Sequence, residues 1–301
     1  MSHQSASPVY IIDTSIYIFR AYFAIPDHWQ SPDGYSLNAV YGYTQFLIKF
    51  LQQTNPTTIA AAFDESLGTC FRNEIYADYK ISRVLPDEDL AFQLAACKSI
   101  TELLGLKCFA SERYEADDII ATVVAKAAKA ERDSCIVSRD KDLGQLLLRD
   151  GDVQWDYSDN KKIDRANFAD KFFIKPEQMV DYLALLGDAV DDIPGVPGIG
   201  KKTAAALLQQ FESIEIMQNN LDKVAVSTLR GAKSLAQKLE DYREQIDMAK
   251  QLVALHAKVP LGKSLKQMNW SLPAIDPLRY FLEEIGLGQR FDRPLNELIS
   301  R

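Results

Sequence analysis

Acidic residues follow three apolar segments of the chain, and this repetition is the first chemical feature of the sequence. Asp13 ends PVYIID, Asp64 ends TTIAAAFD and Asp140 ends DSCIVSRD. Asp is common in turns and at helix N-caps, so each acid alone has an ordinary structural interpretation. If the segments are parallel strands, however, the acids share the sheet edge where such folds bind ligands. Carboxylates gathered there repel one another strongly unless cations lie between them.

Further acids accompany these strand ends. Asp142 follows two residues after Asp140, and YEADDIIA places Glu115, Asp117 and Asp118 at a predicted helix start. Acids in a first helical turn complement the helix dipole, but three in four positions exceed that need. Oxygen ligands without Cys or His favour Mg²⁺ or Mn²⁺ over zinc or copper. Two such ions about 3.5–4 Å apart can clamp the attacking and leaving oxygens of a phosphate displacement, so the sequence indicates phosphodiester hydrolysis.

The stretch GDAVDDIPGVPGIGKKTA, residues 187–204, combines acids with a glycine-rich turn and two lysines. Asp188 and Asp191 are three residues apart and can lie on the same side of one helical turn. The turn has three glycines that let the backbone approach a ligand, at Gly195, Gly198 and Gly200. With Lys201 and Lys202 at the start of the next helix, it predicts a sequence-independent grip on a nucleic-acid backbone. The alternative is an ordinary loop with a solvated lysine pair.

The segment FRNEIYADYKISR, residues 71–83, interleaves cations with aromatic rings. The residues concerned are Arg72, Tyr76, Tyr79, Lys80 and Arg83. Rings can stack on an unpaired base while cations hold phosphates. Glu74 and Asp78 offset two of the three cations, so a solvated helix face and a nucleic-acid contact both remain open.

Histidine and cysteine chemistry is not expected. His3, His28 and His256 have no spacing relation to a nucleophile, which argues against a histidine-based triad. The cysteines lack a CxxC pair and are expected to be buried free thiols rather than disulfide or zinc ligands. They are Cys70, Cys97, Cys108 and Cys135.

Composition sets broad limits on the class of protein. The chain has 301 residues, 47% hydrophobic and 25% charged, which are ordinary values for a globular protein. The net charge of −8 argues weakly against nucleic acid if spread evenly, but it also follows from acids gathered to hold cations. No apolar run reaches the roughly 20 residues of a membrane span, and MSHQSASP lacks signal-peptide features. A cytoplasmic protein without a membrane partner is expected.

The elements that must position these residues alternate between strand and helix. Near-continuous apolar runs at 8–13, 57–64 and 133–140 suit strands of a parallel sheet, with helical patterns at 38–53, 87–105 and 114–130. This alternation predicts an α/β fold with a twisted, mainly parallel sheet flanked by helices. After about residue 176 the pattern becomes helical, and PLRYFLEEIGL is expected to be the final helix.

Six motifs together resemble the structure-specific 5′-nucleases. They are IIDTSIYIFRAYFA, AAFDES, FRNEIYADYKISR, YEADDIIATVV, SRDKDLGQLL and GDAVDDIPGVPGIGKKTA. The sequence is most similar to the bacterial 5′→3′ exonuclease and flap endonuclease domain at the N-terminus of DNA polymerase I, here expected to be free-standing. The resemblance implies a PIN-like catalytic domain with a helical arch over residues 1–175. It implies a helix–three-turn–helix DNA-binding subdomain and C-terminal helices over residues 176–301.

The resemblance also implies roles for individual residues. A first metal would be held by Asp13, Asp64, Glu115, Asp117 and Asp118, and a second by Asp140, Asp142, Asp188 and Asp191. Basic residues that steer or polarise the scissile phosphate are matched by Arg20, Lys80 and Arg83. Tyr79 matches an arch aromatic that can stack on the terminal nucleotide. Hairpin carbonyls would bind a monovalent cation such as K⁺, at Leu185, Leu186, Pro194, Val196 and Ile199.

The implied activity is Mg²⁺- or Mn²⁺-dependent hydrolysis of DNA at a 5′ end or 5′ flap, by a monomer with a functional link to a DNA polymerase. Two residues depart from the family pattern: Arg139 replaces a small residue and Asp192 replaces a common Asn. Neither change removes a predicted ligand. The alternatives are a PIN-type RNase with a similar acidic site and a non-catalytic binder of DNA structures.

Overall fold

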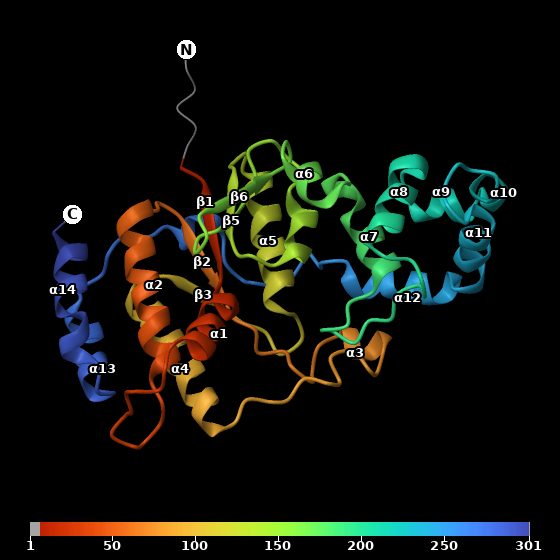
Figure 1. Cartoon of the computed structure of the whole chain (residues 1–301). Coiled ribbons are helices and arrows are strands. Elements are labelled where there is room, and N and C mark those ends of the chain that lie inside the picture. Colours follow the sequence, from red (N-terminus) through yellow and green to blue (C-terminus); the bar gives the residue numbers. More distant parts are fainter. Residues whose placement is uncertain (1–6, 301) are drawn as a thin grey trace, which may run out of the picture.

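In the computed structural model, residues 7–300 are described, and they form one six-stranded sheet with helices on both faces (Figure 1). His3 lies outside the described residues. The strand order is β3-β2-β1-β4-β5-β6. The parallel strands are β1 (Val9–Asp13), β2 (Ile59–Ala62), β3 (Lys107–Phe109), β4 (Ser134–Val137) and β5 (Val153–Asp156), and β6 (Lys161–Asp164) is antiparallel to β5. The predicted fold class is therefore confirmed.

Successive residues of the central strands face opposite sides of the sheet and enter two separate cores. Ile11 and Ala60 belong to the core that includes α5 (Ala116–Lys129), whereas Ile12 and Ala61 belong to the core that includes α2 (Asn38–Thr54). Because both faces are covered, the central strands are apolar along their whole length rather than alternately polar. This is why the sequence identified β1, β2 and β4.

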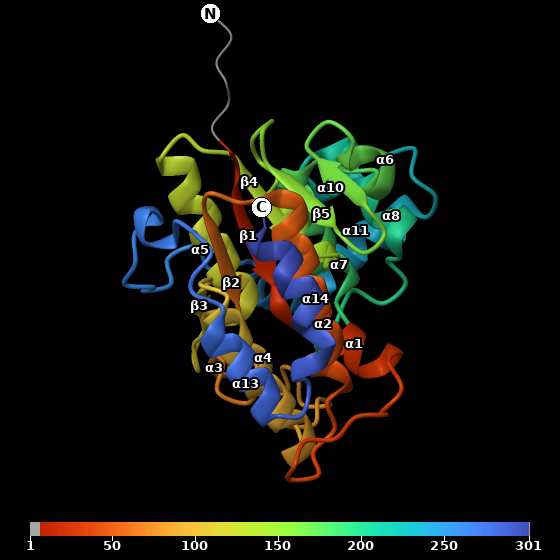
Figure 2. The same cartoon turned by 90° about the vertical axis from the view of Figure 1, so that its left-hand side faces the viewer.

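The face with α2 is also covered by α1 (Thr14–Ala24), α4 (Glu88–Leu103), α13 (Asp276–Glu284) and α14 (Gly288–Ile299) (Figure 2). The expected final helix is α13, and α14 follows it. Pro294 lies inside α14. Because proline is normally disfavoured in a helix interior, the sequence pattern did not predict this helix. The strands β3, β5 and β6 were also not predicted; they are only three or four residues long.

Beyond the sheet, most of the remaining chain is helical and extends to one side in Figure 1. It contains α6 (Phe168–Phe172), α7 (Met179–Leu186), α8 (Lys201–Phe211), α9 (Ile214–Gln218), α10 (Leu221–Ala225), α11 (Ala232–Asp241) and α12 (Arg243–Val253). Three short 3-10 helices are η1 (Lys141–Leu146), η2 (Pro176–Gln178) and η3 (Leu265–Met268). In the predicted arch region, only α3 (Arg72–Ile75) is helical before turns and loops lead into α4.

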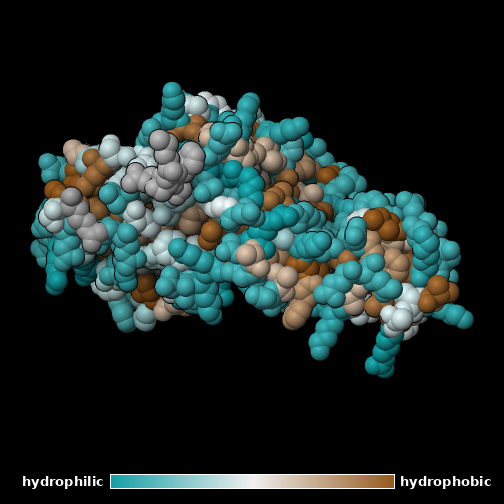
Figure 3. Space-filling model, turned by 90° about the horizontal axis from the view of Figure 1, so that it is seen from above, coloured by the Kyte–Doolittle hydropathy of each residue, from teal (hydrophilic) through white to brown (hydrophobic). Residues whose placement is uncertain are grey.

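The division at residues 175 and 176 stays a prediction, and the structure adds one fact about it. The helices α13 and α14 return to the sheet domain, where α14 packs against α2 and α13 against α4. Polar side chains predominate on the face in Figure 3, with scattered apolar patches. Among the described residues, no helix has the length and apolar character needed to cross a membrane.

Candidate active site

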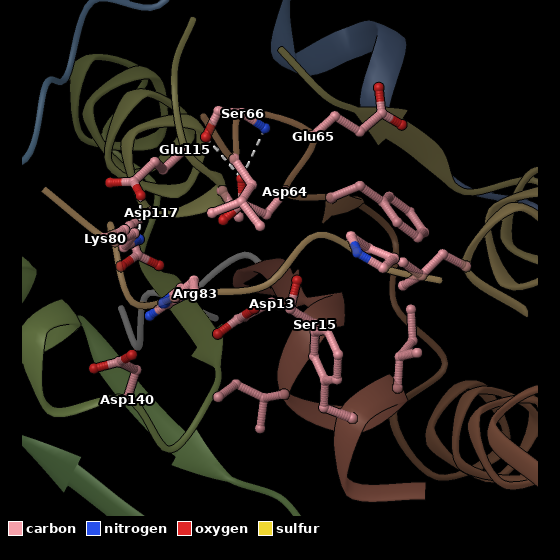
Figure 4. Close-up of a pocket in the computed structure, with 18 of the residues that line it drawn as sticks. Asp13, Ser15, Asp64, Glu65, Ser66, Lys80, Arg83, Glu115, Asp117 and Asp140 are labelled. Carbon is pink, nitrogen blue, oxygen red and sulfur yellow. Dashed lines mark hydrogen bonds and ion pairs between the residues drawn. The ribbon is translucent and has the colours of Figure 1, made fainter. Parts of the chain in front are cut away.

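The carboxyl ends of the central strands open into a cleft of about 1230 Å³. The strand order reverses at β1, with β2 on one side and β4 on the other, and ligands bind at such points in parallel sheets. Figure 4 labels Asp13, Asp64, Glu115, Asp117 and Asp140 in this cleft. In all, the cleft is lined by all but one of the predicted metal ligands. They are Asp13, Asp64, Glu115, Asp117, Asp140, Asp142, Asp188 and Asp191.

Serines fix the carboxylates at the strand ends. Asp13 is buried, and the Ser138 hydroxyl donates to its Oδ2 over 2.8 Å. The same Ser138 oxygen accepts the backbone N–H of Asp140 at 3.0 Å, so one side chain ties together the ends of β1 and β4. Asp64 accepts the amide and hydroxyl of Ser66 at 3.1 and 2.8 Å. The carboxylates of Asp13 and Asp64 are therefore held by serine hydroxyls, contacts that the sequence spacing did not reveal.

The crowding of carboxylates raises the pKa of several acids. Burial and the neighbouring Asp140 raise the pKa of Asp13 to about 7. Burial and Asp140 likewise raise the pKa of Asp142 to about 7. The pKa of Asp117 is well above its usual value because of burial, followed by repulsion from Asp140 and Asp13. These shifts mark a cluster in which negative charge is insufficiently balanced.

The donor set fits a hard divalent cation. The predicted ligands are all carboxylates, and the Lys141 ammonium, 3.1 Å away, is the partner of the buried Asp142 Oδ1. Within residues 7–300, no three His, Cys, Asp or Glu side chains are arranged so that they could hold a metal ion as they stand. Mg²⁺ usually keeps several waters and takes only one or two protein carboxylates, so an open arrangement suits it.

Two predicted phosphate-binding cations lie inside the cleft and are paired with predicted metal ligands. Lys80 forms an ion pair with Glu115, and its Nζ lies 3.8 Å from Asp191 Oδ2. Arg83 Nη2 lies 2.6 Å from Asp191 Oδ1. Burial alone would lower the pKa of Lys80, but Glu115 and Asp191 raise it. The exposed Arg20 also lines the cleft.

Lys141 is a cleft residue that the sequence analysis missed. Its ammonium lies 2.6 Å from Asp188 Oδ2 and 3.1 Å from Asp142 Oδ1, linking η1 to the loop that carries Asp188. Burial acts to raise the pKa of Asp188, but Lys141 and the backbone N–H groups of Val190 and Asp191 together outweigh it, and the pKa is lowered. The signal was present in SRDKDL, where a lysine stands between two acids. Arg139, the departure from the family pattern, is exposed and lines the same cleft.

Arg72 and Asp118 require a correction. They are 1% and 0% exposed and form a bidentate ion pair with distances of 2.7 and 2.8 Å. Arg72 Nε also donates to Leu252 O at 2.7 Å, while Asp118 accepts the backbone N–H of His256 at 2.8 Å. Because both side chains are enclosed and their bonding groups are engaged, the predicted DNA contact of Arg72 and metal ligation by Asp118 are wrong.

Tyr79 also differs from its predicted role. The side chain is 3% exposed, and its hydroxyl donates to Glu115 Oε2 at 2.8 Å. A ring buried in this way cannot stack on a terminal nucleotide, so that prediction is corrected. Tyr76 is only partly buried and packs against the same core. The alternation of aromatic and basic residues in the sequence does not show which ring is buried, Tyr79, and which is more accessible, Tyr76.

The glycine hairpin brings two backbone segments into close contact. A Cβ atom on Gly195 would lie 2.0 Å from Leu186 O, and Gly198 has a φ of +78°, so both positions require glycine. Gly200 is the N-cap of α8, and Lys201 and Lys202 are exposed in its first turn. The predicted grip on a nucleic-acid backbone stays a prediction.

The carbonyls predicted to bind a monovalent cation lie in this hairpin. Leu185 O accepts the N–H of Val196 at 2.9 Å, and Val196 O accepts the N–H of Ile199 at 3.0 Å. These bonds fold the turn back onto the end of α7. They occupy one lone pair of each carbonyl, and a carbonyl oxygen has two. The assignment to Leu185, Leu186, Pro194, Val196 and Ile199 stays a prediction.

The described histidines are not part of the cleft lining. His256 stacks on Tyr114 with ring centroids 5.1 Å apart, and His28 lies edge-on to Trp29. The expectation of free cysteines is confirmed: Cys108 is partly buried, and the other three are buried. Cys70 does line the cleft, but burial raises the pKa of its thiol, so the charged groups available there are carboxylates and cations.

Comparison with known families covers most of the chain. Residues 8–173 match "5'-3' exonuclease, N-terminal resolvase-like domain", and residues 174–276 match "5'-3' exonuclease, C-terminal SAM fold". The chain belongs to this 5′-3′ exonuclease family.

Curated relatives agree with this assignment. The chain is 35% identical over 295 residues to DNA polymerase I of Pseudomonas aeruginosa, covering 97% of this chain and 32% of that protein. It is 32% identical over 269 residues to the 5'-3' exonuclease of Buchnera aphidicola, covering 89% of this chain and 93% of that protein. The chain thus spans about a third of the length of the polymerase relatives it matches.

Solved structures share the fold at low sequence identity. The T5 5'-exonuclease with bound zinc has a TM-score of 0.64 and 18% identity, covering 97% of this chain and 98% of the other. The bacteriophage T5 flap endonuclease in complex with DNA and metal ions gives 0.65 and 17%, with coverages of 97% and 99%. The catalytic core of Rad2 with a DNA substrate gives 0.67 and 14%, with coverages of 97% and 92%.

Proposed function

We propose that the chain is a divalent-metal-dependent 5′→3′ exonuclease and flap endonuclease of DNA. The observation that carries the proposal is the convergence of acids from β1, β2, α5 and two loops on one cleft that also holds Lys80 and Arg83. Membership of the 5′-3′ exonuclease family supports it. Fold likeness to proteins crystallised with metal ions and DNA adds further support.

The cleft would hold two Mg²⁺ or Mn²⁺ ions. One would be held by Asp13, Asp64, Glu115 and Asp117, and the other by Asp140, Asp142, Asp188 and Asp191. When bound, such a pair activates water for attack and stabilises charge on the attacking and leaving oxygens. The hairpin carbonyls would bind K⁺ beside the duplex.

The protein's own side chains orient the substrate. Lys80 and Arg83 would exchange their carboxylate partners for the scissile phosphate and stabilise its developing negative charge. Arg20, exposed at the cleft edge, would steer the strand toward them. The first turn of α8, with Lys201 and Lys202, would hold another phosphate further along the duplex. The site of cleavage would then be set by the separation between hairpin and cleft.

The remaining expectations concern context. We propose that the protein works as a monomer in the cytoplasm and processes 5′ ends produced during DNA synthesis. Its similarity to about a third of the length of DNA polymerase I supports a functional link to a polymerase.

The test is cleavage of a 5′-flap DNA in Mg²⁺, with a flap RNA of the same sequence assayed in parallel. We expect DNA cleavage that is lost in Asp191→Ala and Asp64→Ala, while both variants still bind the flap. Undiminished cleavage by both variants would refute the assignment of the site. Preferential cleavage of the RNA would indicate an RNase, and flap binding without cleavage across Mg²⁺ and Mn²⁺ titrations would indicate a binding protein.

A further inference from the structure

Two loops at the rim of the cleft are fastened to each other. The N–H of Lys80 donates to the backbone oxygen of Asp191 at 3.0 Å, and Arg83 contacts the same residue's carboxylate. Beside them, Asp192 Oδ2 accepts both the N–H and the hydroxyl of Ser82, at 2.9 and 2.7 Å. We call the two hydrogen bonds between Ser82 and Asp192 the rim latch.

The loop that carries Asp192 is itself rigidly closed. Asp188 and Ile193 exchange backbone hydrogen bonds of 2.9 and 2.8 Å across its base. Asp192 has a φ of +56°, a conformation that Asp and Asn tolerate better than most residues. In this conformation the loop presents consecutive acids to different partners, with Asp191 lining the cleft and Asp192 bonded to Ser82. The structure thus gives a contact to Asp192, the acid for which sequence analysis found no role.

The partner loop has little else to hold it. Residues 81–88 are all exposed, including the apolar Val84 at 89%. Exposed segments with few buried contacts open locally at low free-energy cost. Lys80 and Arg83 flank Ser82 in this loop and are the cations proposed to act on the phosphate. Apart from the ion pair of Lys80 with Glu115, their positions depend on the few bonds that tie the loop to residues 191 and 192.

We propose that Asp192 and Ser82 are positioning residues, whose contact holds Lys80 and Arg83 at the cleft, where the scissile phosphate would take the place of their carboxylate partners. This inference rests on the proposed nuclease function. Neither Ser82 nor Asp192 touches the reacting atoms; they act through the backbone between Lys80 and Arg83. Without the rim latch, the two cations can pair with other cleft carboxylates, and fewer molecules hold the productive arrangement.

The test compares variants that separate the lost hydrogen bonds from backbone strain. Asp192→Gly removes the carboxylate and keeps the positive φ free of strain. Asp192→Asn keeps the backbone tolerance and one oxygen acceptor. Ser82→Ala removes the hydroxyl donor but leaves the N–H. Asp150→Ala, an exposed acid in a turn, is the control for the change in net charge.

We expect kcat for flap cleavage by Asp192→Gly to fall by about 10- to 100-fold, because small misplacements of catalytic groups cost up to about 100-fold. KM and the Kd for flap DNA should stay within about twofold, since the defect lies in the chemical step. Asp192→Asn should recover most of the activity, Ser82→Ala should be intermediate, and the control should match the wild type. An Asp192→Gly enzyme with wild-type kcat overturns the proposal. So does a defect of Asp192→Gly that appears only as weaker flap binding, or a fall in kcat that is equally large in Asp192→Asn.

A second measurement keeps this inference separate from the nuclease assignment. Amide hydrogen exchange of residues 80–84 in the metal-free protein does not depend on cleavage. We expect faster exchange in Asp192→Gly than in the wild type or the control, and unchanged exchange overturns the rim latch. A wild-type protein that fails to cleave any flap refutes the proposed function, while its exchange result still reports on the contact itself.

Discussion

The same two motifs produce two ion-pair clusters with opposite characters. FRNEIYADYKISR and YEADD supply the buried pair of Arg72 and Asp118, and they also supply Lys80 and Glu115 in the cleft. Arg72 and Asp118 are 1% and 0% exposed and enclosed, whereas Lys80 and Glu115 are 12% and 8% exposed and line the cleft. Adjacent residues of similar type thus lie in different environments.

The buried and the cleft carboxylates differ in how many hydrogen bonds they accept. Asp118 accepts two guanidinium N–H groups and two backbone N–H groups, so it joins α3, α5 and the segment after α12. Asp117, one residue earlier, faces the cleft and has its pKa raised by burial and by Asp140. A saturated acid stabilises the fold, while an acid left among like charges can take up a cation. Four predictions test this distinction, beginning with the largest effect.

Asp117→Asn should abolish cleavage, with a loss of about 10³-fold or more, because it removes a ligand from the proposed metal site. Chelation of divalent ions should have the same effect on the wild type. The thermal midpoint of the metal-free variant should not fall, since the change relieves repulsion between carboxylates. Single-turnover cleavage and calorimetry measure the two effects, and near-normal cleavage by Asp117→Asn would remove this residue from the site.

Arg72→Met should affect stability first. Breaking a buried ion pair leaves an uncompensated charge on Asp118, and the expected loss is about 3–5 kcal/mol of unfolding free energy. Urea denaturation measures it. The double variant Arg72→Met with Asp118→Leu is the matched control and should recover part of the loss. A single variant as stable as the wild type would mean that this pair does not anchor α3.

Lys80→Met should reduce activity more than stability, the opposite of what is expected for Arg72→Met. We expect kcat to fall by about 100-fold through lost stabilisation of the scissile phosphate. Glu115 keeps contacts with Tyr79 and Arg72, so the unfolding free energy should change far less than in Arg72→Met. Rapid-quench cleavage and urea denaturation, performed on both variants, give the comparison directly. If Lys80→Met lost as much unfolding free energy as Arg72→Met and kept the wild-type kcat, Lys80 would stabilise the fold rather than act on the phosphate.

Replacing Lys201 and Lys202 together by Ala should have the smallest effect. Each lost phosphate contact reduces the slope of log K against log salt by about 1, so flap binding should weaken severalfold at low salt. Cleavage at saturating DNA should be nearly unchanged because the cleft is untouched. Fluorescence anisotropy across a salt series provides the measurement. A salt dependence identical to the wild type would rule out phosphate contacts by this pair.

Sequence patterns predicted the features that depend on local composition. The apolar strands and the acids that follow them identified the sheet and most of the cleft lining, because parallel topology brings strand ends together. Arg72 and Tyr79 contact the end of α12 and the N-cap of α5, respectively, which are distant in sequence. Spacing within a four-residue helix cannot reveal such partners. The Ser82–Asp192 contact spans 110 residues and was invisible for the same reason.

The return of α13 and α14 to the sheet domain bears on how the nuclease could be shortened or transplanted. The second family match ends at residue 276, where α13 begins. Yet Leu282, Phe291 and Leu295 are fully buried in the core formed with α2 and α4. A chain cut at the end of that match would expose a large apolar face and favour aggregation. Any transfer of this domain to another protein must therefore carry the last two helices with it.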